Sequence, residues 1–122
     1  MNKREKGAVF ENYAAEFLEK KGYTLIAKNY STKYGEIDLI MEKEKIIVFI
    51  EVKQRTSDIF GRGEYAIDYR KKRKIYFTAK KFIFENGYSD YDIRFDAIIF
   101  NGTERTPCNW IENIIWGDEI GF

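Results

Sequence analysis

The chain has 122 residues, of which 44% are hydrophobic and 17% aromatic, and its formal net charge is +1. This is enough for one domain with a packed core, spanning residues 1–122, and the small net charge excludes a generally basic coat for nucleic acid. Histidine is absent and Cys108 is the single cysteine, which excludes Ser-His-Asp catalysis, zinc sites built from histidine or thiolates, and an internal disulfide.

No membrane span is expected, because no run of about 18 apolar residues occurs. The N-terminal sequence leads into a helix pattern instead of the apolar core of a signal peptide. Together with the lone cysteine, this pattern favours a reducing, cytoplasmic location.

Residues 7–21 are predicted to form an amphipathic helix that Gly22 ends, because apolar side chains recur there at helical spacing. The apolar stripe comprises Phe10, Tyr13, Ala14, Phe17 and Leu18. Glu11 lies on the flank of this stripe and can reach the interior of the domain. Periodicity alone favours the alternative, in which Glu11 is a boundary carboxylate that extends to water.

Three strands follow. A short strand is predicted over residues 23–29, and residues 36–53 are predicted to form two strands joined by a tight turn at residues 43–45. Side chains on one face of a strand recur at every second position, so Glu51 and Lys53 are expected to point the same way on a buried strand.

Asp38 lies in the first strand of this pair, on the face of Glu36 and Ile40 and opposite the face of Ile37, Leu39 and Met41. Buried carboxylates are costly unless they are paired or hold a metal. The sequence therefore predicts a metal-dependent, phosphodiester-cleaving site built from Asp38, Glu51 and Lys53. A salt-bridged structural cluster is the alternative.

In such a site Asp38 and Glu51 would share a hard cation, Mg²⁺ or Mn²⁺, and the carbonyl of Val52 would add a third oxygen. Lys53 would contact the attacking water or the phosphate. Glu11 would add a ligand, directly or through water.

Residues 54–65 are polar and contain several glycines, and a loop that leaves a strand beside a charged cluster is a suitable place for substrate contacts. An ordinary flexible connection is the alternative. Residues 66–86 are predicted to form a second helix ended by Gly87, with Ile75, Tyr76, Ala79, Phe82 and Ile83 on its apolar face.

The opposite face of this second helix is basic, and the stretch from Arg70 to Lys81 holds seven basic residues and no acidic one. Phe77 and Phe84 lie among the basic residues, so this face suits phosphates together with stacking or groove contacts. A solvated face with the two phenylalanines in a dimer interface is the alternative. Lys71 falls at the edge of the apolar stripe and could lean toward the central strands.

A strand is predicted over residues 91–101, with a turn at residues 101–102. Residues 104–116 are predicted to form a last short strand or strand-helix piece, and Pro107 places it at an edge. Helices between and around strands indicate an α/β sandwich with a mixed sheet.

The segments GEIDLI, VFIEVK with the FG that follows, KKRKI and RFDAIIF, between Glu11 and about Phe100, together resemble the YraN-like family of uncharacterised endonuclease-like proteins. That family belongs to the PD-(D/E)xK, or restriction-endonuclease-like, nuclease superfamily. The resemblance implies a restriction-endonuclease-like core, with a mixed central sheet, flanking helices and the order helix-strand-strand-strand-helix-strand.

The resemblance also implies roles for individual residues. Glu11 corresponds to the acid of the first helix, Asp38 to the metal-binding aspartate, and Glu51 and Lys53 to the glutamate and lysine of the third motif. One departure is that residues 7–11 lack the glycine that many relatives carry immediately before the acid.

Two further positions match by resemblance. Gln54 stands where related nucleases often carry a polar residue, and Lys71 matches a basic residue of the second helix. Archaeal Holliday-junction resolvases share the general arrangement, so branched DNA is a plausible substrate by analogy.

The predicted function is a Mg²⁺- or Mn²⁺-dependent endonuclease that hydrolyses phosphodiester bonds in branched or otherwise structured DNA. The residues expected to contact nucleic acid are Gln54, Arg55, Arg70, Lys71, Arg73, Lys74, Lys80 and Lys81. One site cuts one strand, so paired cuts would need a homodimer. An inactive nucleic-acid-binding module of the same fold and a structural or assembly protein with salt-bridged acids stay open as alternatives.

Overall fold

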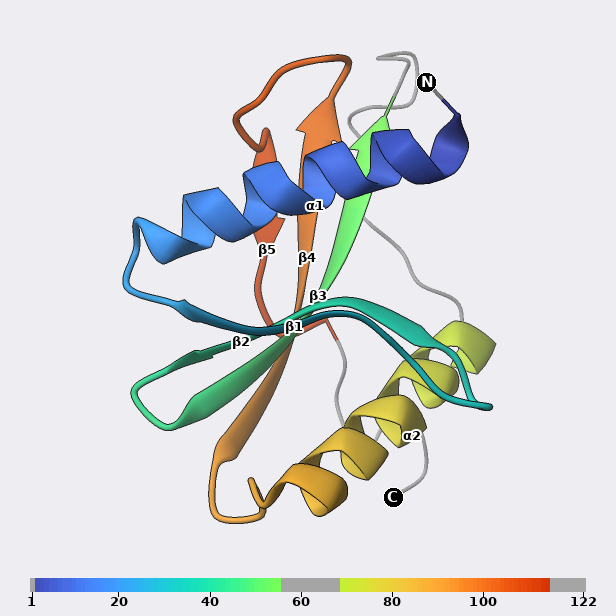
Figure 1. The fold of residues 1–122 in the computed structure, drawn as a ribbon, viewed down its shortest axis with the longest axis vertical. Helices are drawn as coiled ribbons and strands as arrows, with labels where there is room; N and C mark the ends of the chain where they lie inside the picture. Colours follow the sequence, from blue (N-terminus) through green and yellow to red (C-terminus); the bar gives the residue numbers. More distant parts are fainter. Residues whose placement is uncertain (1, 56–68, 115–122) are drawn as a thin grey trace.

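The structure is a computed structural model that describes residues 2–55 and 69–114, which form two helices and five strands (Figure 1). The elements are α1 (Lys3–Glu19), β1 (Thr24–Ser31), β2 (Glu36–Lys43), β3 (Ile46–Arg55), α2 (Tyr69–Asn86), β4 (Asp92–Asn101) and β5 (Asn109–Ile111). The predicted mixed α/β fold is confirmed. The order differs from the expected one by the short strand β5, which follows β4.

The strands form one sheet in the order β1-β2-β3-β4-β5. β1, β2 and β3 pair antiparallel, β3 and β4 pair parallel, and β4 and β5 pair antiparallel. The mixed sheet is therefore confirmed. The β2–β3 turn is tight, as predicted, because Glu44 and Lys45 adopt φ angles of 50° and 63° that match the twist of the two strands.

Helix α1 begins at Lys3, four residues before the predicted start at residue 7. Its first turn is held by Asn2, whose side chain accepts from the Glu5 backbone N–H at 2.8 Å while Glu5 accepts from the Asn2 backbone N–H at 3.2 Å. This reciprocal cap satisfies two amides that a helix end leaves unpaired. The apolar stripe starts later, so periodicity placed the start too late.

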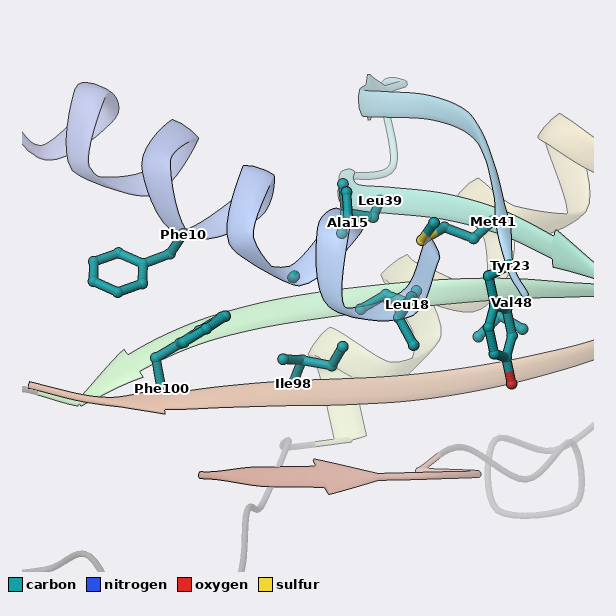
Figure 2. Packing of buried hydrophobic residues seen from close by; sticks show 11 residues of the cluster. Phe10, Ala15, Leu18, Tyr23, Leu39, Met41, Val48, Ile98 and Phe100 are labelled. Carbon is teal, nitrogen blue, oxygen red and sulfur yellow. The ribbon is translucent and has the colours of Figure 1, made fainter. Parts of the chain in front are cut away.

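Helix α1 covers one face of the sheet and builds the first of two cores (Figure 2). Phe10, Ala14 and Leu18 are buried against residues of β3 and β4, and the rings of Phe10 and Phe100 lie 5.1 Å apart. Tyr13 and Phe17 pack at the margin of this core. The predicted apolar face of the helix is therefore confirmed.

Helix α2 covers the opposite face and builds the second core, in which Ile75, Ala79, Phe82 and Ile83 are buried and Tyr76 is half-buried. This is the predicted apolar face. Residues 66–68 of the predicted helix and residues 56–65 of the predicted loop lie outside the described residues.

Ile37 departs from the predicted strand faces. It packs in the α2 core with Ile40, whereas Leu39 and Met41 pack in the α1 core. The reason is that the pairing of β2 with β3 stops at Leu39, and the free end of β2 lies toward α2 (Figure 1). Strict alternation therefore fails where the two strands separate.

A polar cluster joins β4 to β5 and to the start of β1. The buried carboxylate of Asp96 accepts from the Arg94 guanidinium at 2.9–3.2 Å, from Trp110 Nε1 at 2.9 Å and from the Asn113 backbone N–H at 3.2 Å. Arg94 also donates to the Tyr23 hydroxyl at 2.8 Å. Burial alone lowers the pKa of Arg94, but these hydrogen bonds outweigh it and raise that pKa above its ordinary value.

The remaining boundaries differ by small shifts. The first strand runs two residues beyond its predicted end, to Ser31, and the strand predicted over residues 91–101 begins at Asp92. The tail gives a strand only over Asn109–Ile111, at the edge of the sheet as predicted. Among residues 2–55 and 69–114, no helix is long and apolar enough to cross a membrane.

Candidate active site

The candidate site lies where β2 separates from β3. The ladder between them runs from Lys43 opposite Ile46 to Leu39 opposite Ile50, and its register would next place Asp38 opposite Glu51. There the Asp38 side chain replaces the main-chain acceptor of the ladder, because its Oδ2 accepts a hydrogen bond from the Val52 backbone N–H at 2.8 Å. The carboxylate is thereby fixed between the two strands.

Glu51 faces the α2 side of the sheet, and its side chain is 15% exposed. Its Oε1 accepts from Nζ of Lys71, which comes from the first turn of α2. Its Oε2 is buried and has no hydrogen-bond partner among the described residues. A buried carboxylate oxygen without a partner is costly, so this atom marks a place where a cation or a water would be stabilised.

The electrostatics of the site follow from a concentration of acids. The pKa of Asp38 is raised to about 6, first by burial and then by the nearby charges of Glu11, Glu51 and Glu36, while the hydrogen bond from the Val52 amide partly offsets the rise. Burial likewise raises the pKa of Glu11, which Asn29 partly offsets by a hydrogen bond. The negative charges of these acids therefore repel one another, and a cation bound among them would reduce this repulsion.

A pocket of about 620 Å³ opens beside these acids, between the ends of β2 and β3 and the first half of α2. Its charged lining consists of Glu36, Asp38, Glu51, Arg70, Lys71, Lys74 and Asp96. The apolar lining is mainly Ile37, Phe49, Ile75, Phe95 and Ile114. A pocket with acids on one wall and cations on the other suits a ligand that carries a phosphate and a metal ion.

The structure brings several of the predicted residues together. Asp38, Glu51 and Lys71 line one pocket, and Glu11 is close enough to raise the pKa of Asp38. The prediction that Lys71 leans toward the central strands is confirmed by its ion pair with Glu51. Glu11 is half-buried, which agrees both with a reach toward the interior and with the alternative of a boundary carboxylate.

Lys53 is not brought into this group. It follows Glu51 on β3, but it is exposed, and among the described residues no hydrogen bond or ion pair joins it to Asp38 or Glu51. The expected burial of Lys53 is therefore wrong, because on this face of β3 the first turn of α2 contacts Glu51, and Lys53 lies two residues farther along the strand. Its role in the chemistry stays a prediction.

The residues predicted to contact nucleic acid divide into two groups along α2. Arg70, Lys71 and Lys74 line the pocket. Lys80 lies over the Tyr76 ring, at 5.6 Å from its centroid, and Lys81 pairs with Glu85 at 3.9 Å; neither lines the pocket.

The remaining predicted contacts lie elsewhere. Gln54 donates from Nε2 to the Gly102 carbonyl at 2.7 Å, so its amide bridges β3 to the turn after β4. Arg55 is half-buried at the end of β3. Arg73 packs between aromatic rings on α2.

The donor set fits a hard cation, although it is small. Within the described ranges no group of three or more Asp, Glu or Cys residues is arranged to hold a metal ion. Mg²⁺, however, is often bound by one or two carboxylates and keeps several waters. Asp38 and Glu51 supply two carboxylates, and the Val52 carbonyl faces the same side as its N–H, toward Asp38.

Sequence reasoning missed Glu36, which lines the pocket and raises the pKa of both Asp38 and Glu11. Its strand parity, shared with Asp38, is a signal that could have found it. It also missed Tyr34 and Tyr69, two exposed aromatic residues that precede the pocket-lining Gly35 and Arg70. Tyr34 reaches this position because the β1–β2 loop docks on α2. No local pattern reports such docking.

The family model described as Uncharacterised protein family UPF0102 matches residues 10–100. A UPF0102 protein of Fusobacterium nucleatum subsp. nucleatum is 48% identical over 122 residues, covering 100% of both chains. Another, of Sulfurihydrogenibium sp., is 46% identical over 104 residues, covering 85% of this chain and 90% of its own. One of Caldanaerobacter subterraneus subsp. tengcongensis is 40% identical over 116 residues, covering 94% and 95%.

Proposed function

The chain belongs to the uncharacterised protein family UPF0102, and for it we propose the function of a Mg²⁺- or Mn²⁺-dependent endonuclease that hydrolyses phosphodiester bonds in DNA. One observation carries the proposal. Asp38 and Glu51 converge where β2 leaves β3, and the second oxygen of Glu51 is buried without a partner among the described residues.

The arrangement of elements supports a restriction-endonuclease-like assignment, which is part of the proposal. A helix precedes three antiparallel strands, a second helix crosses to a parallel fourth strand, and the two acids lie on the second and third strands. This is the order and placement that the resemblance to PD-(D/E)xK nucleases implies.

In the proposed site Asp38, Glu51 and the Val52 carbonyl would hold the cation. When bound, a cation of this kind neutralises phosphate charge and lowers the pKa of a coordinated water. The chain's own part is to orient Asp38 through the Val52 amide and to hold the Glu51 carboxylate, largely buried, in the wall of the pocket. Glu11, held by Asn29, adds negative charge behind Asp38.

The basic residues around the pocket have separate tasks in the proposal. Hydrolysis joins a water oxygen to phosphorus and breaks one P–O ester bond, so negative charge grows on the leaving oxygen. Lys71, which pairs with Glu51, would stabilise that charge, and Lys53 remains the candidate that would orient water from its exposed position on β3. Arg70 and Lys74 would bind the phosphates on either side of the one that is cut.

The test is cleavage of single-stranded, duplex, flapped and four-way DNA with Mg²⁺ or Mn²⁺. We expect Asp38→Asn and Glu51→Gln each to abolish cleavage, and to abolish the rise in melting temperature that Mn²⁺ gives to the unsubstituted chain without DNA. Glu104→Gln, an exposed acid in the β4–β5 turn, is the matched control. Cleavage that survives in both site variants would sink the proposal.

A nucleic-acid-binding module without turnover is the second candidate, because Arg70, Lys71 and Lys74 line the pocket and would bind phosphates without a cation. The same assay separates the two functions. A module binds DNA with unchanged affinity in Lys53→Ala and Glu51→Gln and cuts no substrate with either metal.

A further inference from the structure

Two tyrosine rings are exposed beside the pocket. Tyr34, in the β1–β2 loop, is 40% exposed and Tyr69, at the start of α2, is 53% exposed. They are two of four large hydrophobic side chains that are exposed in the described residues. Exposed aromatic rings that gather in one place indicate an interaction surface.

Together with Phe77 and Arg73 these tyrosines form a continuous surface, here called the aromatic platform. The Arg73 guanidinium lies over both the Tyr69 ring and the Phe77 ring, with its carbon 5.7 Å and 5.4 Å from their centroids. The Phe77 ring lies 5.8 Å from the Tyr34 ring, with 36° between their planes. Arg73 also donates to the Tyr69 hydroxyl at 3.3 Å.

The loop that carries Tyr34 is fixed on α2, so the platform is preformed. The hydroxyls of Thr32 and Thr78 lie 3.2 Å apart in a hydrogen bond. Gly35 packs against the helix, and a Cβ built on it would make an ordinary van der Waals contact, 3.5 Å from Cβ of Lys74. A binding surface that is already ordered loses less conformational entropy when a ligand binds.

The platform adjoins the candidate active site. Gly35 follows Tyr34 and Arg70 follows Tyr69, and both of these neighbours line the pocket that contains Asp38 and Glu51. Cations surround the rings, because Lys33 lies over Tyr34 at 5.3 Å while Arg70 and Lys74 are exposed at the pocket rim. Planar rings alternating with cations complement a ligand that alternates planar groups with anions.

We propose that the aromatic platform binds unpaired nucleobases, so that the substrate is DNA with a single-stranded segment beside the phosphate to be cut. A base inside a duplex is already stacked on both faces, whereas an unpaired base has free faces for Tyr34 and Tyr69. The statement about cutting rests on the proposed nuclease function. The binding itself does not, because it needs no turnover.

The experiment measures fluorescence anisotropy of labelled single-stranded and duplex oligonucleotides in EDTA, where no metal-dependent cleavage occurs. We expect Tyr34→Ala and Tyr69→Ala each to weaken single-strand binding about tenfold, as loss of one stacking ring does, and to change duplex binding less than twofold. Tyr34→Phe and Tyr69→Phe keep the ring and should bind as the unsubstituted chain does. Phe84→Ala removes a ring that is 85% exposed and outside the platform, and is the control.

Circular dichroism and melting temperature establish that each variant is folded. The inference is overturned if the alanine variants bind single strands normally, if they weaken duplex and single strand equally, or if the unsubstituted chain binds neither. Platform-dependent binding without cleavage in either Mg²⁺ or Mn²⁺ would keep this inference and end the nuclease proposal. Cleavage at an unchanged rate in the platform variants would keep the nuclease proposal and end this inference.

Discussion

The carboxylate of Asp38 takes the place of a main-chain acceptor where β2 and β3 part. Its bond to the Val52 amide satisfies a donor that the sheet leaves unpaired, and this bond lowers the pKa of the carboxyl. Burial and three nearby acids nevertheless raise the pKa to about 6 from its ordinary value of 3.8. Asp38 is thus a group that the fold holds in place although its charge is unfavourable there.

This conflict predicts how stability depends on pH in a metal-free chain. The Asp38 carboxyl binds its proton more tightly in the folded chain than in the unfolded chain. The stability that this proton contributes is therefore fully present below pH 4 and is lost as the pH rises through about 6. Asp38→Asn keeps an acceptor for the Val52 amide and removes the charge. In EDTA at pH 8 we expect it to raise the free energy of unfolding by on the order of 2–3 kcal/mol.

Urea unfolding at pH 8 and at pH 4 is the measurement, and the gain should vanish at pH 4. Asp92→Asn replaces an exposed acid at the start of β4 and should change stability at neither pH. An equal gain at both pH values would mean that packing, and not charge, distinguishes the variant.

The contact between Glu51 and Lys71 is the second feature at this scale. Lys71 is half exposed, with a side chain 51% exposed, whereas that of Glu51 is only 15% exposed. Removal of Lys71 leaves the largely buried Glu51 carboxylate without this counter-charge. We therefore expect Lys71→Met to cost about 1–2 kcal/mol at pH 8 in EDTA.

Lys81→Met provides the comparison, because its partner Glu85 is itself exposed and the pair spans one helical turn. That change should cost less than about 0.5 kcal/mol. Both variants are compared by chemical unfolding. Equal small losses would show that Glu51 is hydrated in the folded chain and needs no cation beside it.

At the scale of elements, β4 is tied to its neighbours by a polar cluster inside the α1 core. Asp96 is 1% exposed and accepts from Arg94, Trp110 and Asn113. The aspartate therefore fixes the short strand β5 and the segment after it against β4. It resembles Asp38 in using a carboxylate to bind a backbone amide, here that of Asn113 in the segment after β5.

Asp96→Ala should lower the free energy of unfolding by about 3–5 kcal/mol, because Arg94 would stay in the core without a counter-ion. Asp92→Ala, on the same strand but exposed, should cost less than about 0.5 kcal/mol. Thermal and urea unfolding of the two variants decide the point. A loss below about 1 kcal/mol for Asp96→Ala would mean that water reaches Arg94 in the folded chain.

The sequence predicts helices and strands correctly where apolar periodicity is strong. It does not predict the features that depend on a helix cap or on the separation of two strands. The buried faces of both helices followed from apolar spacing. The start of α1 did not, because Asn2 and Glu5 extend the helix beyond its apolar stripe. Ile37 broke the alternation because β2 loses its partner strand beyond Leu39.

At the scale of the whole molecule, charge is segregated although the net charge is only +1. The first half of α2 lines the pocket with Arg70, Lys71 and Lys74, and the acids lie on the facing wall. DNA binding by this chain should therefore depend on salt through a few local contacts and not through the whole surface.

Arg70→Gln and Lys74→Gln are each expected to reduce the steepness of log Kd against log salt by about 0.7 for a single strand. Arg4→Gln, exposed on α1 and outside the pocket lining, should leave the slope unchanged. Anisotropy titrations between 50 and 300 mM salt (roughly the range in which such slopes are resolved) provide the slopes. A reduced slope in Arg4→Gln would point to diffuse attraction by the entire molecule.

The candidate site shows the same division between local and global information. Asp38 and Glu51 could be selected from sequence, because each is an acid inside an apolar strand and their register follows from the turn at Glu44 and Lys45. The exposure of Lys53 could not, since it depends on how far the helices cover the sheet. The aromatic platform could not either, since the loop and the helix that form it are distant in sequence.

The bond from the Val52 amide to Asp38 also makes this one proton a probe of the site. In a ¹⁵N-labelled sample, the Val52 cross-peak senses whether its acceptor is an anion, a neutral acid or a carboxylate that is shared with a cation. A titration with acid and a titration with diamagnetic Mg²⁺ would thus read the state of the carboxylate directly, from a nucleus that no substitution has disturbed.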